Sequence, residues 1–225
     1  MPEFLAAEEL QRQVWGADDT ADPADLMMVI QHEGGLVAGA FDTGNLVGYV
    51  FAFPTREPHV QHSHRLAVHP SMRGGGLSIQ LKRYQRTWCL ERGIREVRWT
   101  FDPLRVTNAH LNIARLGAIV RSYHSDYYGV MAGINAGLPS DRLLAEWLLD
   151  TPRAAGLAQD QRLPAAGDVE RVVIPADIDR LLAQSPAEAL SERLRVRAEL
   201  SACLQDGYVV TGFDRAAPAY LLTRA

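Results

Sequence analysis

The fold of this chain is decided by one stretch of sequence, Val68-His69-Pro70-Ser71-Met72-Arg73-Gly74-Gly75-Gly76-Leu77-Ser78. It runs from the end of an expected strand through three glycines into an expected amphipathic helix. Because glycine has no Cβ, consecutive backbone N–H groups can turn inward together, and the following helix adds unpaired donors and the positive end of its dipole. The stretch therefore predicts a cradle for the pyrophosphate of an anionic cofactor.

Other interpretations of the glycine run explain less of it. A plain strand-to-helix turn needs one glycine at a positive φ angle and leaves the rest of the run unexplained. A Walker loop places Lys and then Ser or Thr after its last glycine, whereas Leu77 and Ser78 follow Gly76. A dinucleotide fingerprint fails at its third glycine. The pattern that remains is Arg-x-x-Gly-x-Ser at 73–78.

Composition narrows the class of protein. The 225 residues suffice for one good-sized domain or for a domain with a smaller appendage. A net charge of −4 gives no electrostatic case for nucleic acid or a membrane surface as partner. Cys89 and Cys203 lie far apart without metal-ligand spacing. With an acidic N-terminus and no long apolar run, these features predict a cytoplasmic protein without a membrane anchor.

The periodicity of apolar residues predicts an alternation of helices and strands. In chain order these are helices 3–15 and 22–31, a hairpin of strands 36–41 and 46–53, strand 62–68, a helix from 77 to 93, strand 96–101, helix 108–116 and strands 118–129 and 143–149. In the helix after the glycines, Leu77, Leu81, Tyr84 and Trp88 form the expected apolar stripe. Lys82, Arg83 and Arg86 are expected to face water.

Residues 73–78 and this element order resemble the GNAT acetyltransferase superfamily, whose acyl-CoA loop has the pattern Gln/Arg-x-x-Gly-x-Gly/Ala. Ser78 stands where Gly or Ala is usual. The resemblance covers about residues 1–150 and implies an α/β fold with a mixed sheet and acetyl-CoA as cosubstrate, without a metal. It also implies donor-binding residues, which are Leu66, Ala67, Val68, Arg73, Gly74, Gly75, Gly76, Leu77, Ser78, Asn108 and Asn112.

The helix at 108–117 resembles the family helix that carries the general acid. Ile113 falls where many members have the tyrosine that protonates the departing thiolate, and Ala118 falls where an aromatic residue is usual. Asn108 fits two interpretations, a helix N-cap or a contact with the CoA arm, and Asn112 one turn later favours the second. For the missing acid the candidates are Tyr123, Tyr127 and Tyr128, of which the last two are expected on opposite faces of a strand.

Two side chains are candidate catalytic residues. On an extended strand His62, His64, Leu66 and Val68 share one face, and a histidine has an ordinary pKa of about 6.5, suited to a general base. His64 is therefore the candidate base, with a buried structural histidine as the alternative. Asp102 ends the next predicted strand as a second base candidate or an anchor for a cationic amine, and a turn formed by Asp before Pro is the equal alternative.

The chain continues beyond the predicted core. Residues 151–168 have the composition of a linker, and residues 169–225 are expected to form a small α+β extension with strands 169–174, 208–213 and 220–223 and helices 176–182 and 186–204. So short a segment is expected to pack on the core or on a partner subunit, which is compatible with a homodimer.

The sequence thus predicts a GNAT-type N-acetyltransferase that moves an acetyl group from acetyl-CoA to a primary amine by direct attack. The acceptor is a small-molecule or peptide amine of unknown identity. Two alternatives stay open. A catalytically degenerate CoA-binding regulatory module is suggested by Ile113, and a structural or assembly protein could be built around the extension.

Overall fold

The computed structural model describes residues 1–17, 20–129, 137–161 and 169–224. The described chain divides into two compact units. The first is Met1–Arg98, and the second holds the described residues from Trp99 onwards. The predicted division at residue 150 is a different boundary and stays a prediction. No described helix is long and apolar enough to cross a membrane.

The first unit begins with two helices, continues with three strands, and ends with a third helix and the start of a fourth strand. Its elements are α1 (Pro2–Trp15), α2 (Ala24–His32), β1 (Leu36–Asp42), β2 (Asn45–Pro54), β3 (Val60–Val68), the 3₁₀ turn η1 (Pro70–Met72), α3 (Leu77–Leu90) and the start of β4 (Glu96–Phe101). The strand order is β1-β2-β3-β4. β1, β2 and β3 are antiparallel neighbours, whereas β3 and β4 run parallel. Because α3 joins β3 to β4, it is a crossover connection between parallel strands.

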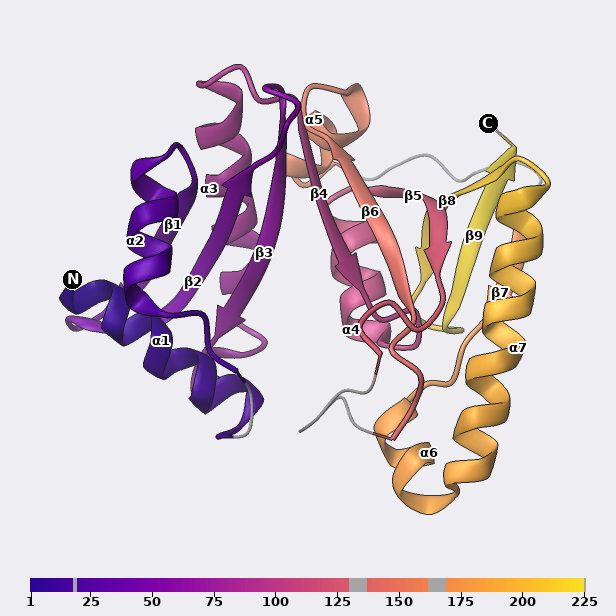
Figure 1. The fold of residues 1–225 in the computed structure, drawn as a ribbon. Helices are drawn as coiled ribbons and strands as arrows, with labels where there is room; N and C mark the ends of the chain where they lie inside the picture. Colours follow the sequence, from indigo (N-terminus) through magenta and orange to yellow (C-terminus); the bar gives the residue numbers. More distant parts are fainter. Residues whose placement is uncertain (18–19, 130–136, 162–168, 225) are drawn as a thin grey trace. The chain divides into compact units, whose positions relative to one another are not determined.

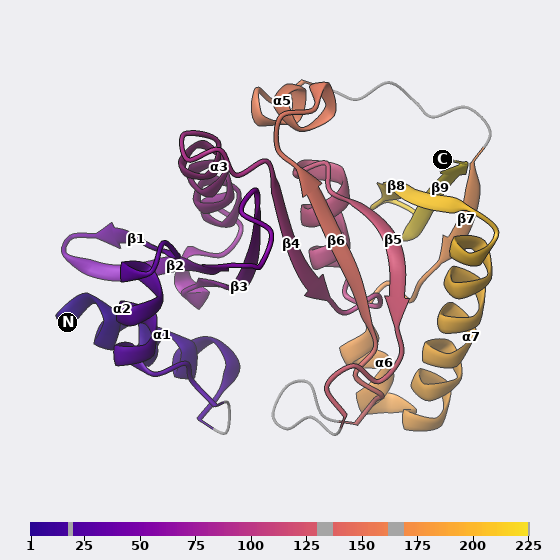
Figure 2. The same cartoon turned by 45° about the horizontal axis from the view of Figure 1, so that its top comes forward.

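Helices cover both faces of this sheet (Figures 1 and 2). On one face Leu10 of α1 and Met27 of α2 pack with Tyr49, Phe51 and Ala67. On the other face Leu81 of α3 packs in a cluster with three inward residues of β1 and β2, which are Leu36, Val50 and Ala52. The two clusters hold the strand β3 and the loop after it in a fixed relation to α3.

The second unit completes the mixed α/β architecture. Its elements are the end of β4, α4 (Val106–Ala109), the π-helical turn η2 (His110–Arg115), β5 (Ile119–His124), β6 (Arg142–Leu148), α5 (Pro152–Ala158), β7 (Glu170–Val173), α6 (Ile178–Gln184), α7 (Pro186–Gln205), β8 (Tyr208–Asp214) and β9 (Ala219–Arg224). The strand order is β4-β6-β5-β8-β9-β7. The predicted fold class, α/β with a mixed sheet, is confirmed.

The C-terminal segment is an integral part of the second unit. β8 pairs with β5 of the same chain at Val120↔Val210. The buried Tyr220 donates a hydrogen bond of 2.8 Å to the carbonyl oxygen of Pro103, just after β4. α7 lies along β5, β7 and β8 (Figure 1). The segment therefore stabilises the end of β4 and the edge of β5 that does not pair with β6.

Two details of the second unit differ from the sequence predictions. The strand predicted over 118–129 ends at His124, and Tyr127 and Tyr128 lie in the turn after it with half of each side chain exposed. The expectation that these two tyrosines lie on opposite faces of a strand is wrong, because the strand ends before them. Within the predicted linker, Thr151 caps α5 by accepting a hydrogen bond from the Ala154 amide, and Pro152 is the first helical residue.

The face of α3 that packs on the sheet also differs from the prediction. Its buried residues are Leu81, Lys82, Gln85 and Cys89, and Lys82 is only 2% exposed. Tyr84, expected in the apolar stripe, is 53% exposed. The helix is rotated relative to the expected stripe because polar groups on β3 satisfy Lys82 and Gln85 in the interior. The expectation that Lys82 faces water is wrong.

Candidate functional site

The glycine run forms an open loop between β3 and α3. Gly74 and Gly76 have φ angles of +83° and +81°, which favour glycine, while Gly75 has an ordinary φ. A Cβ at Gly74 or Gly76 would meet no atom within 4 Å, so the backbone conformation and not crowding requires glycine there. Arg73 before them is exposed. The two left-handed glycines turn the chain into the first turn of α3.

The backbone amides of this loop are available to a ligand. Gly76 is the N-cap of α3 and has no side-chain cap, and its carbonyl oxygen accepts from the amides of Ile79 and Gln80 at 3.0 and 3.1 Å. The amides of residues 74–78 donate no hydrogen bond to any described residue. Consecutive unpaired amides beside the positive end of a helix dipole make an anion site. The predicted loop residues Arg73 to Ser78 therefore lie together in one cradle.

Strand β3 leads into this loop with one edge unpaired. On the β2 side Leu66, Ala67 and Val68 pair with Val50, Tyr49 and Gly48. On the other side the register with β4 covers only Val60↔Glu96 to His62↔Arg98. No described strand pairs with the remaining edge of β3, so the backbone there is available for an extended ligand.

A β-bulge interrupts β3 at His64. Phe51 pairs with Arg65 and Ala52 pairs with Ser63, so His64 has no partner of its own in the β2–β3 register. The bulge breaks the alternation of faces, because His64 and Arg65 both reach Asp22 while Leu66 packs on the α3 side. The expectation that His64 shares a face with Leu66 and Val68 is wrong.

His64 lies in a polar triad that joins β3 to the segment between α1 and α2. Its Nε2 is 3.2 Å from Oδ1 of Asp22, and Nε of Arg65 is 2.9 Å from Oδ2 of the same carboxylate. Burial would raise the pKa of Asp22, but the hydrogen bond from His64 and the charges of His64 and Arg65 outweigh it and hold that pKa below its usual value. Because Asp22 is ionised, its carboxylate accepts a hydrogen bond from Nε2–H of His64, which leaves Nδ1 as the acceptor nitrogen of the ring.

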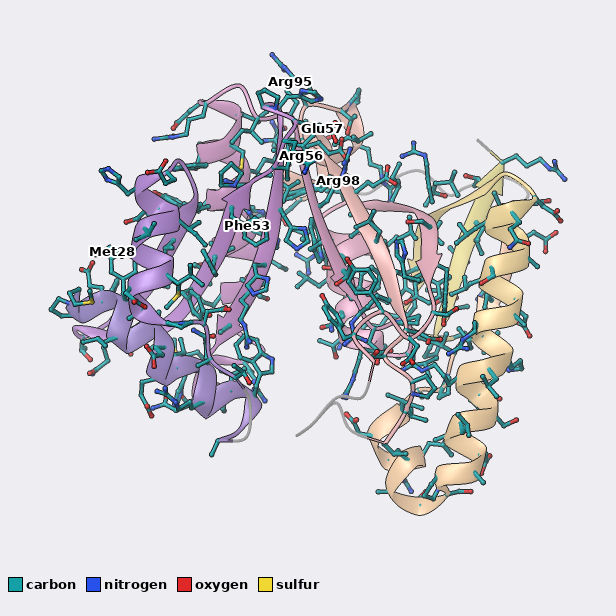
Figure 3. The ribbon with its side chains drawn as sticks, in the orientation of Figure 1. Met28, Phe53, Arg56, Glu57, Arg95 and Arg98 are labelled. Atoms are coloured by element: carbon teal, nitrogen blue, oxygen red, sulfur yellow. The ribbon has the colours of Figure 1, made fainter. Side chains whose placement is uncertain are left out.

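Aromatic rings line the surroundings of His64. Its ring lies 5.6 Å from the ring of Phe51, edge to face, and 5.6 Å from that of Phe53. Phe53, labelled in Figure 3, stacks on His62 at 4.9 Å. Burial first, and then the charges of His64 and Lys82, lower the pKa of His62 to about 4. His62 is therefore neutral at neutral pH, and His64 is the more exposed of the two.

An ion-pair network joins the turn before β3 to the start of β4. Arg98 of β4 lies 3.0 Å from Glu57 and 2.6 Å from Glu96. Glu57 and Arg98 are labelled close together in Figure 3. These contacts hold the parallel start of β3 and β4, where the two strands are paired.

Asp102 has its oxygens engaged by its own unit. Oδ1 accepts a hydrogen bond of 2.8 Å from the Leu104 amide, which is the turn geometry expected of Asp before Pro. Oδ2 accepts one of 2.7 Å from Nη2 of Arg193, a side chain of α7 that is 1% exposed. The structure therefore brings Asp102 together with Arg193, and His64 with Asp22 and Arg65.

The helix after β4 places the two candidate asparagines differently. Arg105 is the N-cap of α4, so Asn108 is not an N-cap and lies exposed in the first turn. Asn112 is buried in the π-helical turn, where its carbonyl oxygen accepts from the Ala118 amide at 3.0 Å. Ile113 is fully buried in the core. The two asparagines therefore differ in exposure, and their contact with the CoA arm stays a prediction.

Two of the tyrosines that are candidates for the general acid form hydrogen bonds with side chains of their own unit. Tyr123 donates a hydrogen bond to Asp141, and burial, together with this carboxylate, raises its pKa well above the usual value. Tyr128 lies 3.0 Å from the Thr100 hydroxyl, under the guanidinium of Arg142. Arg142, Asp141 and Arg197 form a network around them that sequence patterns do not reveal. Among the described residues no group of three His, Cys, Asp or Glu side chains could hold a metal ion.

The comparisons with known proteins agree on one family. A model of the acetyltransferase (GNAT) family matches residues 4–117, about half of the chain. No curated protein matches the sequence. The crystal structure of an aminoglycoside 6'-acetyltransferase type Ii is similar with a TM-score of 0.53 at 17% identity, covering 66% of this chain and 90% of its own.

Two further solved structures are similar. The ribosomal-protein-S18-alanine N-acetyltransferase from Escherichia coli gives a TM-score of 0.54 at 14% identity, with 75% of this chain and 92% of its own covered. An aminoglycoside 6'-N-acetyltransferase complexed with coenzyme A gives 0.50 at 16% identity, with 66% and 91% covered. At such identities the likeness concerns the fold alone.

Proposed function

The chain belongs to the acetyltransferase (GNAT) family, and on that premise we propose that it transfers an acetyl group from acetyl-CoA to a primary amine by direct attack. The observation that carries the proposal is the row of unpartnered backbone amides at residues 74–78, at the N-terminus of α3. Backbone donors suit a pyrophosphate, because they bind oxygens without needing a charged side chain. The proposed donor contacts are therefore this loop and the unpaired edge of β3 at Leu66, Ala67 and Val68.

His64 is the proposed general base. The amine nitrogen must lose a proton as it attacks the thioester carbonyl, and Nδ1 of His64 is the nitrogen left to take it. Asp22 then stabilises the imidazolium that forms, since its carboxylate lies 3.2 Å from Nε2. The C–N bond forms, the C–S bond breaks, and CoA leaves as its thiolate.

Asp102 remains the second candidate base and ranks behind His64. Both its oxygens already accept hydrogen bonds, from Leu104 and Arg193, which fits an anchor for the loop after β4. Asn108 and Asn112 stay proposed CoA contacts. The exposed Asn108 is the better placed for a side-chain contact, because Asn112 is buried.

The acceptor is proposed as a small-molecule or peptide amine. Similar structures carry names that include an aminoglycoside and the alanine of a ribosomal protein as acceptors. Both are amines, and they differ in size. The cytoplasmic location and a homodimer are further parts of the proposal that rest on composition and on the C-terminal segment.

One observation favours a second function, a CoA-binding regulatory module without turnover. Ile113 is fully buried where the family resemblance implies a tyrosine acid, and Tyr123 is engaged with Asp141. A module of this kind binds acetyl-CoA and transfers nothing.

One set of amine acceptors distinguishes these two functions. The full chain is mixed with acetyl-CoA and, in turn, an aminoglycoside, a peptide with N-terminal alanine and a polyamine, and thiol release is followed together with the mass of the amine. We expect CoA release coupled to an acetylated amine. Binding of acetyl-CoA without release supports the module, and no binding contradicts both.

A further inference from the structure

A buried polar cluster lies between α3 and β3, beneath the bulge. It consists of Gln61 and Ser63 of β3 and of Lys82, Gln85 and Cys89 of α3, and is called the α3–β3 cluster below. Nζ of Lys82 donates to Oγ of Ser63 at 2.8 Å and to Oε1 of Gln85 at 3.0 Å. Nε2 of Gln85 and Sγ of Cys89 both donate to Oε1 of Gln61, at 3.4 and 3.3 Å. Five polar side chains thus form one connected network inside the core.

Lys82 is the only lysine in the sequence. All other residues in the combined count of 23 lysines and arginines are arginines. The single lysine is also the one that lies fully buried on the inner face of α3. An ammonium group is compact and can lose its proton when buried, whereas a guanidinium stays charged. A lysine at this position is therefore compact and able to lose its proton, and an arginine would be neither.

The surroundings of Lys82 make the charge of its amino group depend on pH near neutrality. Burial lowers its pKa to about 7, against which the interaction with Cys89 acts. His62 on β3 is a second titratable group that interacts with Lys82. The residues that β1 and β2 turn towards α3 are apolar, namely Leu36, Val50 and Ala52. Lys82 thus interacts with the Cys89 thiol and the His62 imidazole, and it donates hydrogen bonds to two neutral oxygens, Oγ of Ser63 and Oε1 of Gln85.

The cluster meets the proposed reaction site at Ser63. Ser63 immediately precedes the bulged His64, and its side chain points to the α3 side while His64 points to Asp22. We propose that Lys82 is a positioning residue for acetyl transfer: its ammonium group fixes Ser63 at the bulge and places a positive charge beside β3, the strand proposed to bind the acetyl donor. The inference rests on the proposed function.

The chemical role follows from the charge that develops during transfer. As the C–N bond forms and the C–S bond breaks, negative charge grows on the carbonyl oxygen and then on the sulfur. A fixed positive charge in a water-excluded interior stabilises both more than it stabilises the neutral thioester. The charged form of Lys82 is the active one, so activity falls as the pH rises through the pKa of Lys82.

A single lysine allows a direct test. The full chain is labelled with [ε-¹³C]lysine, so that one resonance reports Lys82, and is titrated from pH 5 to 9. We expect a midpoint near 7, and a chain whose resonance does not titrate below pH 9 contradicts the inference. Acetyl-CoA is then added, with adenosine 3',5'-bisphosphate as the probe that reaches only the loop. Acetyl-CoA should shift the resonance and the bisphosphate should not, and equal effects contradict the inference.

Two variants supply the kinetic readout, on the best of those amine acceptors. Lys82→Arg keeps the charge at every pH, so the loss of kcat above about pH 7 should disappear. Lys82→Met removes the charge, so kcat should fall about tenfold or more at pH 6, with little change in KM and no such loss at higher pH. Variants with the wild-type pH profile and kcat overturn the inference. If Lys82→Met does not fold, Lys82→Arg and the titration still decide.

The two proposals fail differently. A chain that binds no acetyl-CoA overturns the proposed function and removes the role of Lys82 with it. A chain that transfers acetyl groups with Lys82→Met as well as the wild type overturns only the role of Lys82.

Discussion

The Nε2 atom of His64 lies 3.2 Å from Oδ1 of Asp22, although 42 positions separate the two residues. The contact exists because β3 bulges at His64 and because the chain between α1 and α2 brings Asp22 over that face of the sheet. A histidine held by a carboxylate through one nitrogen presents the other to a substrate. The pair therefore gives the proposed base a defined tautomer and orientation.

Replacement of the base should slow turnover. His64→Ala removes the proton acceptor, and general base catalysis contributes about 10²- to 10⁴-fold to a rate. We expect kcat to fall by at least about a hundredfold in the thiol-release assay, with acetyl-CoA binding retained. The matched control is His59→Ala, because the His59 side chain is 61% exposed and interacts with Glu57. A loss of less than about tenfold removes His64 as the base.

The loop glycines should differ in their tolerance of a side chain. Gly76→Ala forces alanine into a left-handed conformation, and such strain costs about 1–3 kcal/mol. Gly75→Ala, with ordinary φ, should be neutral or stabilise the fold by up to about 1 kcal/mol. Urea unfolding of the two variants measures the difference. Equal stabilities would show that the loop does not hold the conformation described.

His62 should make stability depend on pH in a defined window. Its pKa in the folded chain, about 4, lies below the ordinary 6.5, so the unfolded chain binds more protons between these values. The free energy of unfolding should therefore fall as the pH drops from 6.5 towards 4. His62→Phe keeps a ring against Phe53 and should flatten this slope, whereas His59→Phe should not. Identical slopes in both variants would contradict the burial of His62.

The C-terminal segment should be needed for the stability of the second unit. Arg193→Met removes the buried partner of Asp102, and breaking such a pair costs about 3–5 kcal/mol. Arg195→Met, on the same helix, breaks pairs with Glu192 and Glu199 near the surface and should cost at most about 1 kcal/mol. The measurement is the free energy of unfolding of each variant, compared with that of the wild type. A loss as small for Arg193→Met as for Arg195→Met would make the segment an appendage.

Local sequence signals were sufficient for the loop and for most elements. Glycines at 74 and 76 are required by their φ angles, and the element order follows from apolar periodicity. Thr151 followed by Pro152 is also a local signal for a helix start, which the composition of the predicted linker obscured.

Features that depend on contacts between elements could not be predicted in the same way. Lys82 is buried because Ser63 and Gln85 accept its hydrogen bonds, and a periodic pattern does not show which polar residues will meet. The bulge at His64 reverses the faces of the residues after it relative to those before it, and no residue type in β3 marks it. The π-helical turn at His110–Arg115, in which Asn112 is buried, likewise has no marker in the apolar periodicity.

Thermal unfolding of the full chain with acetyl-CoA tests the central claim most directly. A ligand at 100 times its dissociation constant adds about 2.7 kcal/mol to stability, which for a chain of this size raises Tm by roughly 5–10 °C. We predict a rise of that size with acetyl-CoA and with CoA, since both present the pyrophosphate to residues 73–78. An unchanged Tm at millimolar acetyl-CoA would contradict the account.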